Sequence, residues 1–295
     1  MLLCIITFVG FVNPCYSKKP PAKAWIGTWA TSPQLVEPNN MPPAPGLSNN
    51  TLRQVVCVSA GGKKLHFKFS NEFGKSPVTL KAVQIAVSTG GSVIDEATSK
   101  ELKFNGKTEF TMEPGTTVTS DPVSFNLEPR MQVAITIAFG ETPPALTGHP
   151  GSRTTSYVLA GNSNLPNADF TNAIKTDHWY LITGIDVEAS KSATATIGII
   201  GDSITDGRGS GTNKQNRWPD ILAMNLQKNR KTQSVGVLNL GIGGNCVLRG
   251  GLGPTALNRY NRDILKQQGV RWVIIFEGVN DLGSTRDSTA AFNVA

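Results

Sequence analysis

Three short segments of this chain combine residue types that could carry out nucleophilic chemistry. The first is Gly201-Asp202-Ser203, which follows the apolar run 195–200 and opens a glycine-rich loop. A buried strand that ends in a turn presents a serine hydroxyl at the mouth of a sheet, the usual place for a nucleophile. Such a hydroxyl needs a general base to accept its proton. No histidine follows Ser203, so the nucleophile half of a site is present and the base half is not.

The second and third segments are glycine- and asparagine-containing loops that each follow an expected strand. Residues 239–245 contain Gly244, and residues 278–281 contain Asn280. The backbone N–H groups of Ser203 and Gly244 and the amide of Asn280 are the kind of donors that a developing oxyanion requires. Each segment alone is weak evidence, because such residues more often serve turns and helix caps. Their arrival at three successive strand ends favours one shared site.

The elements that must position these loops follow from hydrophobic periodicity after about residue 190. A short apolar strand, 197–200, precedes an expected helix, 217–231, which has Pro219 in its first turn. The apolar side of that helix is expected to hold Ile221, Leu222, Met224 and Leu226. A strand, a second helix ending at Gly269 and a third strand follow, at residues 235–238, 255–268 and 270–276. Alternation of strands and helices predicts a parallel sheet wrapped by helices.

The preceding region has a different pattern, one of alternating apolar and polar residues. Leu65, Phe67 and Phe69 form one such series, and further series lie at 83–87 and 133–137. Turn-forming clusters separate them, which predicts an antiparallel, sandwich-like arrangement. Residues 18–50 are proline-rich and expected to be irregular, with Trp25 and Trp29 anchored on the core. The predicted organisation is a β-rich domain at 18–190 followed by an α/β domain at 191–295.

The first 17 residues are predicted to be a secretory signal peptide that is cut after Ser17, which implies export to the cell envelope or beyond. The apolar stretch from Leu2 to Val12 is too short to span a bilayer. Two alternatives stay open at this stage. One is a lipoprotein cut before Cys15, although Pro14 is a poor residue there, and the other is a buried N-terminal strand.

Composition and spacing exclude several other classes of function. The net charge is +7, but most of the surplus is scattered over 191–295 without interleaved aromatic residues, so no nucleic-acid partner is expected. Cys57 and Cys246 have no metal-ligand spacing and are expected to be buried free thiols. The pair Gly241 and Gly243 lacks the third glycine and the downstream acidic residue of a dinucleotide site. These spacings predict neither a metal site nor a dinucleotide cofactor.

With these residues in place, the chain resembles the SGNH, or GDSL, hydrolase family. Residues 201–207, Gly-Asp-Ser-Ile-Thr-Asp-Gly, are similar to the first block of that family. Gly244 matches the glycine of the second block, and residues 278–281 match the Gly-x-Asn-Asp of the third. Residues 216–219 and 25–34, together with Glu277, resemble the xylan-esterase-like branch, in which an N-terminal β-domain precedes the hydrolase domain.

The resemblance implies a flavodoxin-like α/β esterase that uses no metal and no organic cofactor. Ser203 would be the nucleophile, and Ser203, Gly244 and Asn280 would form the oxyanion hole. The implied substrates are carboxylic esters, above all acetyl or short acyl esters on plant-type glycan, hydrolysed through an acyl-enzyme. The family's Asp-x-x-His block has no counterpart here, so the chain is expected to be truncated before it and inactive as given.

A histidine that is already present would have to replace the missing base, and the sequence favours none. His66 is expected on the exposed side of a strand, and His149 in a loop. His178 follows Asp177, which could orient it, but all three precede Ser203, against the order of the family. A non-catalytic carbohydrate-binding protein, or pseudoenzyme, is therefore retained as the alternative function.

Overall fold

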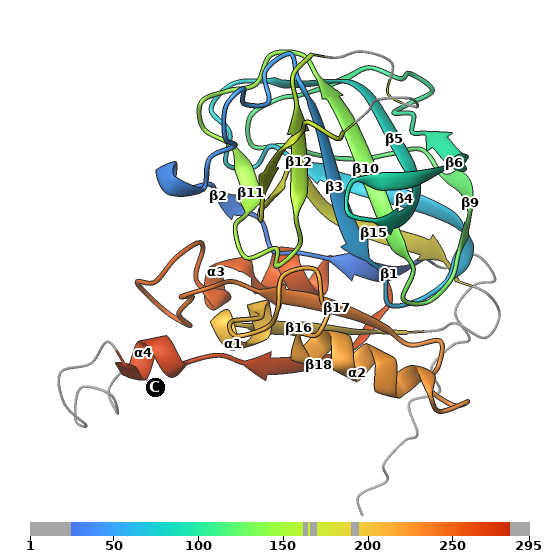
Figure 1. Ribbon diagram of the computed structural model, residues 1–295. Helices are drawn as coiled ribbons and strands as arrows, with labels where there is room; N and C mark the ends of the chain where they lie inside the picture. Colours follow the sequence, from blue (N-terminus) through green and yellow to red (C-terminus); the bar gives the residue numbers. More distant parts are fainter. Residues whose placement is uncertain (1–24, 162–164, 166–169, 190–194, 284–295) are drawn as a thin grey trace, which may run out of the picture.

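The computed structural model describes residues 25–161, 165, 170–189 and 195–283, so the predicted signal peptide and the expected domain boundary near 190 lie outside the described residues. Up to residue 188 every strand pairing is antiparallel, whereas the strands after 195 pair in parallel (Figure 1). The change of pattern near residue 190 therefore corresponds to a change of sheet type. The division into two domains stays a prediction.

Antiparallel sheets make up the first part. The first sheet comprises β1 (Trp25–Ala30), β15 (Ile182–Glu188), β4 (Gly62–Ser70), β8 (Thr117–Thr119) and β9 (Val123–Leu127). The second comprises β13 (Ile174–Thr176), β12 (Ser156–Leu159), β3 (Thr51–Cys57), β10 (Gln132–Phe139), β5 (Val78–Gly90), β6 (Val93–Glu101) and β7 (Phe110–Met112). A small third sheet comprises β14 (Trp179–Tyr180), β11 (Thr147–His149) and β2 (Gln34–Leu35), and a 3₁₀ turn covers Pro38–Asn40.

The core of this part is built as the alternation predicts. Leu65, Phe67 and Phe69 of β4 are fully buried and share one cluster with apolar residues of β3, β5, β10 and β15. Residues 18–50 were expected to be irregular, but in the described part, from residue 25, the apolar stretch Trp25–Ala30 forms strand β1 against β15. Trp29 is buried and meets Trp179 edge to face, with ring centroids 5.0 Å apart. Trp25 is only half-buried and stacks on His66.

The second part is a three-stranded parallel sheet in the order β17 (Gly236–Gly241), β16 (Thr196–Gly201), β18 (Val270–Phe276). Its helices are α1 (Ser203–Asp206), α2 (Trp218–Gln227), α3 (Ala256–Tyr260) and α4 (Val279–Gly283), with a π-helical turn at Asn261–Leu265. The expected second helix, 255–268, is thus broken into α3, capped by Thr255, and this turn. The parallel sheet is confirmed in the described residues, and its strands match the expected positions within a few residues.

Two expectations about this sheet are corrected. Helix α2 packs through Leu222, Ala223 and Leu226, whereas Ile221 and Met224 are about 40% exposed, because only part of the apolar stripe reaches the sheet. Strand β18 is only partly covered by helices within the described residues: Ile274 packs in the cluster of α2, but most residues of the strand are exposed. No helix in the described part of the chain is both long and apolar enough to cross a membrane.

The two parts pack directly on each other. The Gly27 N–H of β1 donates to Gln268 O (2.9 Å), and the Thr196 hydroxyl of β16 donates to Gly27 O (3.0 Å). Figure 1 shows β1 of the antiparallel part running beside β17. The β-rich part therefore packs on the parallel sheet through β1.

Cys57 and Cys246 are free and buried, as expected, and burial raises the pKa of the Cys57 thiol to about 11.

Candidate active site

Ser203 stands at the turn between β16 and α1. The strand ends at Gly201, and the Asp202 carboxylate caps the helix by accepting the Ile204 N–H (2.9 Å). This capping bond fixes the first turn of a helix too short to be stable by itself. Gly207 ends the helix with a φ of +122°, a conformation that favours glycine. Ser203 is partly exposed, so its hydroxyl lies at the surface end of a buried strand, where the sequence places it.

The loop after β17, which contains Gly244, packs against the turn of Ser203. Gly201 lies opposite Gly241 in the parallel pairing, and the Ile242 N–H donates to Gly201 O (3.0 Å). The Asn239 amide donates to Thr205 O in α1 (2.9 Å). Gly244 has a φ of +70°, which suits a residue without Cβ, and its carbonyl accepts the Leu252 N–H (3.0 Å).

The loop after β18, which contains Asn280, is tied to the loop of Gly244. The Asn280 side-chain amide donates to Asn245 O, the carbonyl next to Gly244, at 2.7 Å. The Asp281 carboxylate accepts the Val247 N–H (2.9 and 3.0 Å to its two oxygens). The structure therefore brings all three loops to one edge of the sheet. The roles assigned to Ser203, Gly244 and Asn280 stay predictions.

The three histidines are each held by groups other than Ser203. His66 is not on an exposed face as expected, because its side chain is only 14% exposed and it pairs with the buried Asp186 carboxylate (2.8 Å). His178 donates to Pro150 O (2.7 Å), while the Asp177 carboxylate accepts the hydroxyls of Thr155 and Thr212. Asp177 is therefore committed elsewhere and does not orient His178.

His149 is buried and is bonded to Asp206, in the helix that begins with Ser203. It lies in the short strand β11 and not in a loop. Its Nδ1 donates to Ser32 O (2.9 Å), and its Nε2 bonds Asp206 Oδ1 of α1 (2.9 Å). Both ring nitrogens are thus occupied, so His149 links the β-rich part to the helix of Ser203 and presents no nitrogen to the serine hydroxyl.

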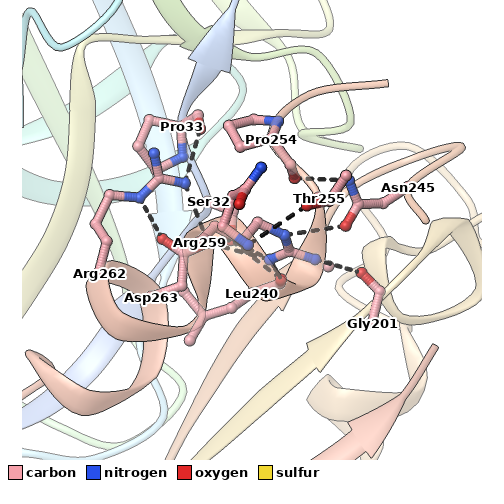
Figure 2. Close-up of polar contacts among 12 residues, drawn as sticks. Ser32, Pro33, Gly201, Leu240, Asn245, Pro254, Thr255, Arg259, Arg262 and Asp263 are labelled. Atoms are coloured by element: carbon pink, nitrogen blue, oxygen red, sulfur yellow. Dashed lines mark hydrogen bonds and ion pairs between the residues drawn. The ribbon is translucent and has the colours of Figure 1, made fainter. Parts of the chain in front are cut away.

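A buried arginine behind the three loops is the feature that sequence reasoning missed. The Arg259 side chain is 0% exposed and lies in α3. Its guanidinium donates to acceptors from the strand ends, the Gly244 loop, the π-helical turn and the β-rich part. Figure 2 shows Gly201 O, Leu240 O, Asn245, Ser32 and Asp263 around it. The Glu277 carboxylate is a further acceptor. The pattern Arg259, Arg262 and Asp263 looks like a solvated helix face in the sequence, and nothing in it signals burial.

The Glu277 carboxyl, directly after β18, completes this network. Burial raises its pKa to about 7, Arg259 opposes the rise, and nearby Asp202 and Asp281 add to it. Its Oε2 lies 3.4 Å from Arg259 Nη2, while Oε1 has no hydrogen-bond partner among the described residues. Among the described residues no group of three or more His, Cys, Asp or Glu side chains is placed to hold a metal ion.

Comparison with known proteins identifies the part of the chain that holds this site. Residues 199–294 match the model of the GDSL-like lipase/acylhydrolase family. No curated protein matches the chain. A solved structure of a family two carbohydrate esterase from Cellvibrio japonicus aligns over 93% of this chain and 70% of its own, at 13% identity and a TM-score of 0.27, a likeness too low to carry an argument. By the family of residues 199–294, the chain is a hydrolase of ester bonds.

Proposed function

We propose that the chain is a serine esterase of the GDSL type in which Ser203 is the nucleophile. The observation that carries the proposal is the meeting of the loops of Ser203, Gly244 and Asn280 at one edge of the parallel sheet. The substrate class is carboxylic esters, with acetyl or short acyl groups on carbohydrate favoured by the resemblance of residues 216–219 and Glu277 to xylan-esterase-like proteins. Export, as predicted from residues 1–17, suits a glycan substrate.

In the proposed reaction the Ser203 Oγ attacks the acyl carbon and loses its proton to a base. The negative charge that develops on the carbonyl oxygen is stabilised by the N–H groups of Ser203 and Gly244 and by the Asn280 amide. An amide nitrogen carries two protons, so the bond from Asn280 to Asn245 O orients the group and leaves the second proton for the oxyanion. The alcohol leaves with a proton, and water then hydrolyses the acyl-serine.

The base is not among the described histidines in this proposal. His66, His149 and His178 are each bonded to another group, and no histidine follows Ser203. The described residues supply the nucleophile and the oxyanion donors only. We therefore expect negligible hydrolysis of p-nitrophenyl acetate by the 295-residue polypeptide in a buffer without imidazole.

Imidazole added to the buffer tests the nucleophile directly, because it can accept the serine proton. The polypeptide is incubated with p-nitrophenyl acetate with and without imidazole, and the peptide that contains Ser203 is analysed by mass spectrometry. We expect an acetyl group on Ser203 that depends on imidazole. The Ser203→Ala variant measures the reaction of imidazole with the ester in solution. The proposal would be overturned if the ester released p-nitrophenol at the same rate with the parent polypeptide and with Ser203→Ala, and Ser203 stayed unmodified.

A further inference from the structure

The hydrogen bonds of the Arg259 side chain reach the ends of all three strands of the parallel sheet. Its guanidinium donates to the carbonyl of Gly201, the last residue of β16 (3.0 Å). It also donates to the carbonyl of Leu240, the second-last residue of β17. Its Nη2 also lies 3.4 Å from Glu277, the first residue after β18. Gly201 and Glu277 directly precede the loops that hold Ser203 and Asn280, and Leu240 lies one residue before the end of β17, which leads into the loop of Gly244.

The same guanidinium reaches directly into the site through Asn245. Its Nε donates to Asn245 Oδ1 (3.0 Å), and the backbone carbonyl of Asn245 accepts the Asn280 amide (2.7 Å). The Asn245 amide in turn donates to Leu252 O (2.7 Å) and Pro254 O (2.8 Å), which closes the loop on itself. One residue thus sets the backbone next to Gly244 and, through it, the amide of Asn280.

The surroundings of Arg259 hold its planar donor set in one orientation. A fully buried guanidinium is costly unless its donors are satisfied, and here Nε, Nη1 and Nη2 all have partners. Asp263 supplies a carboxylate at 3.1 Å, and the Ser32 hydroxyl of the β-rich part accepts from Nη1 at 3.0 Å. A rigid fork of five N–H donors can bridge several acceptors at fixed angles, which the flexible ammonium of a lysine cannot.

We infer that Arg259 is a positioning residue, which holds the loops of Ser203, Gly244 and Asn280 in register for attack on one ester carbonyl. The inference rests on the proposed function for its catalytic meaning. The structural juxtaposition that carries it is one buried guanidinium bonded to three strand ends. The inference requires that loss of the Arg259 guanidinium displaces all three loops together, although Arg259 does not itself contact the ester.

Arg262 provides a matched control. It is three residues away on the same segment and also pairs with Asp263 (2.6 Å). Its other partners, Glu72 Oε1 (3.0 Å) and Pro33 O (3.1 Å), belong to the β-rich part and not to the strand ends. Arg262→Met therefore removes an ion pair to the same carboxylate, from a side chain that is 22% exposed, without touching the loops of the site.

The first measurement is amide hydrogen exchange of the full polypeptide, which does not depend on catalysis. Arg259→Met should accelerate exchange together in the peptides that cover 201–204, 240–246 and 277–281, and Arg262→Met should leave them as in the parent protein. Arg259→Lys keeps the charge and replaces Arg259→Met in this experiment if the latter does not fold. We expect faster exchange in the same three peptides. Unchanged exchange in the three loops of a folded Arg259 variant would overturn the inference, whatever the activity.

The second measurement is the imidazole-dependent acetylation of Ser203 as a function of ester concentration. Misplacement of reacting groups by about 1 Å can cost roughly 100-fold in rate. We expect a loss of that order in the maximal rate for Arg259→Lys, with little change in the half-saturating ester concentration, and no comparable loss for Arg262→Met. Equal losses in both variants would contradict a positioning role. Absence of acetylation in the parent protein would instead contradict the proposed function and leave the exchange result to decide on Arg259.

Discussion

At the scale of single residues, the Glu277 carboxyl is held in surroundings that disfavour its charge. Its side chain is 0% exposed, and burial raises its pKa from 4.5 to about 7 despite the Arg259 guanidinium at 3.4 Å. Between these two values the folded protein retains a proton that the unfolded chain has lost. At this group the folded state therefore binds more protons, and the contribution of Glu277 to the free energy of unfolding falls as the pH rises through this window.

Glu277→Gln should remove this pH dependence, because the amide has the shape of the carboxyl and does not ionise. The urea midpoint of the parent protein, measured at several values between about pH 5 and about pH 8, should decline more with rising pH than that of the variant. Glu113→Gln changes an exposed glutamate and should keep the parental slope. If the urea midpoint of Glu277→Gln declined with pH as steeply as that of the parent protein, the Glu277 carboxyl would not be the group that retains the proton.

The predicted site residues illustrate what single positions in a sequence can disclose. The loops of Ser203, Gly244 and Asn280 were predictable as neighbours because each follows a recognisable strand, and parallel strands end at one edge. Arg259 was not, because its partners lie up to 227 positions away in the sequence, as for Ser32. The bridge between His149 and Asp206 is hidden for the same reason, since it joins β11 to α1 across 57 positions.

At the scale of elements, the close approach of α1 to β17 requires a glycine at 241. A Cβ at this position would collide with the backbone nitrogen of Asp206 and lie 2.8 Å from its Cα. The obstacle is backbone, so no side-chain rotation relieves it. A Cβ at Gly243, two residues on, would meet only the Asp206 carboxylate at 3.3 Å, which can shift by a few tenths of an ångström.

Gly241→Ala should therefore displace α1, lower the free energy of unfolding by about 1–3 kcal/mol and slow the acetylation of Ser203. Gly243→Ala should have a smaller effect on both. Urea unfolding monitored by tryptophan fluorescence gives the first quantity, and the imidazole-dependent assay gives the second. Equal unfolding midpoints in the two variants would contradict the close packing of α1 on β17.

Periodicity predicted the strands better than the helices. The alternation of Leu65, Phe67 and Phe69 fixes which face of β4 is buried, because a strand has only two faces. The stripe on α2 was broader than the surface it packs on, so Ile221 and Met224 remain exposed. The break between α3 and the π-helical turn has no clear mark in the sequence, because Arg259 is held there by tertiary contacts with the strand ends.

At the scale of the whole molecule, the β-rich part contributes to the structure of the candidate site. Ser32 contacts the Arg259 guanidinium, and His149 contacts Asp206. The Gln227 amide of α2 donates to Ser59 O of the β-rich part (2.9 Å). A reading of the sequence by segments separates these residues at about 190, because the pattern changes there. The contacts across that division show that the change of pattern does not imply structural independence.

Strand β18 leads us to expect that the polypeptide self-associates. In the described part of the chain it pairs only with β16, and Ile275 is 74% exposed, with Trp272 and Phe276 each about half exposed. An apolar edge strand is a surface for pairing with another chain, so a concentration-dependent increase in mass should be seen by sedimentation velocity. Ile275→Lys should reduce this increase, because a charge on the edge opposes strand pairing. Val93→Lys alters a residue 62% exposed in β6 and should leave the association unchanged. A monomer at every concentration, or equal effects of the two substitutions, would refute association through β18.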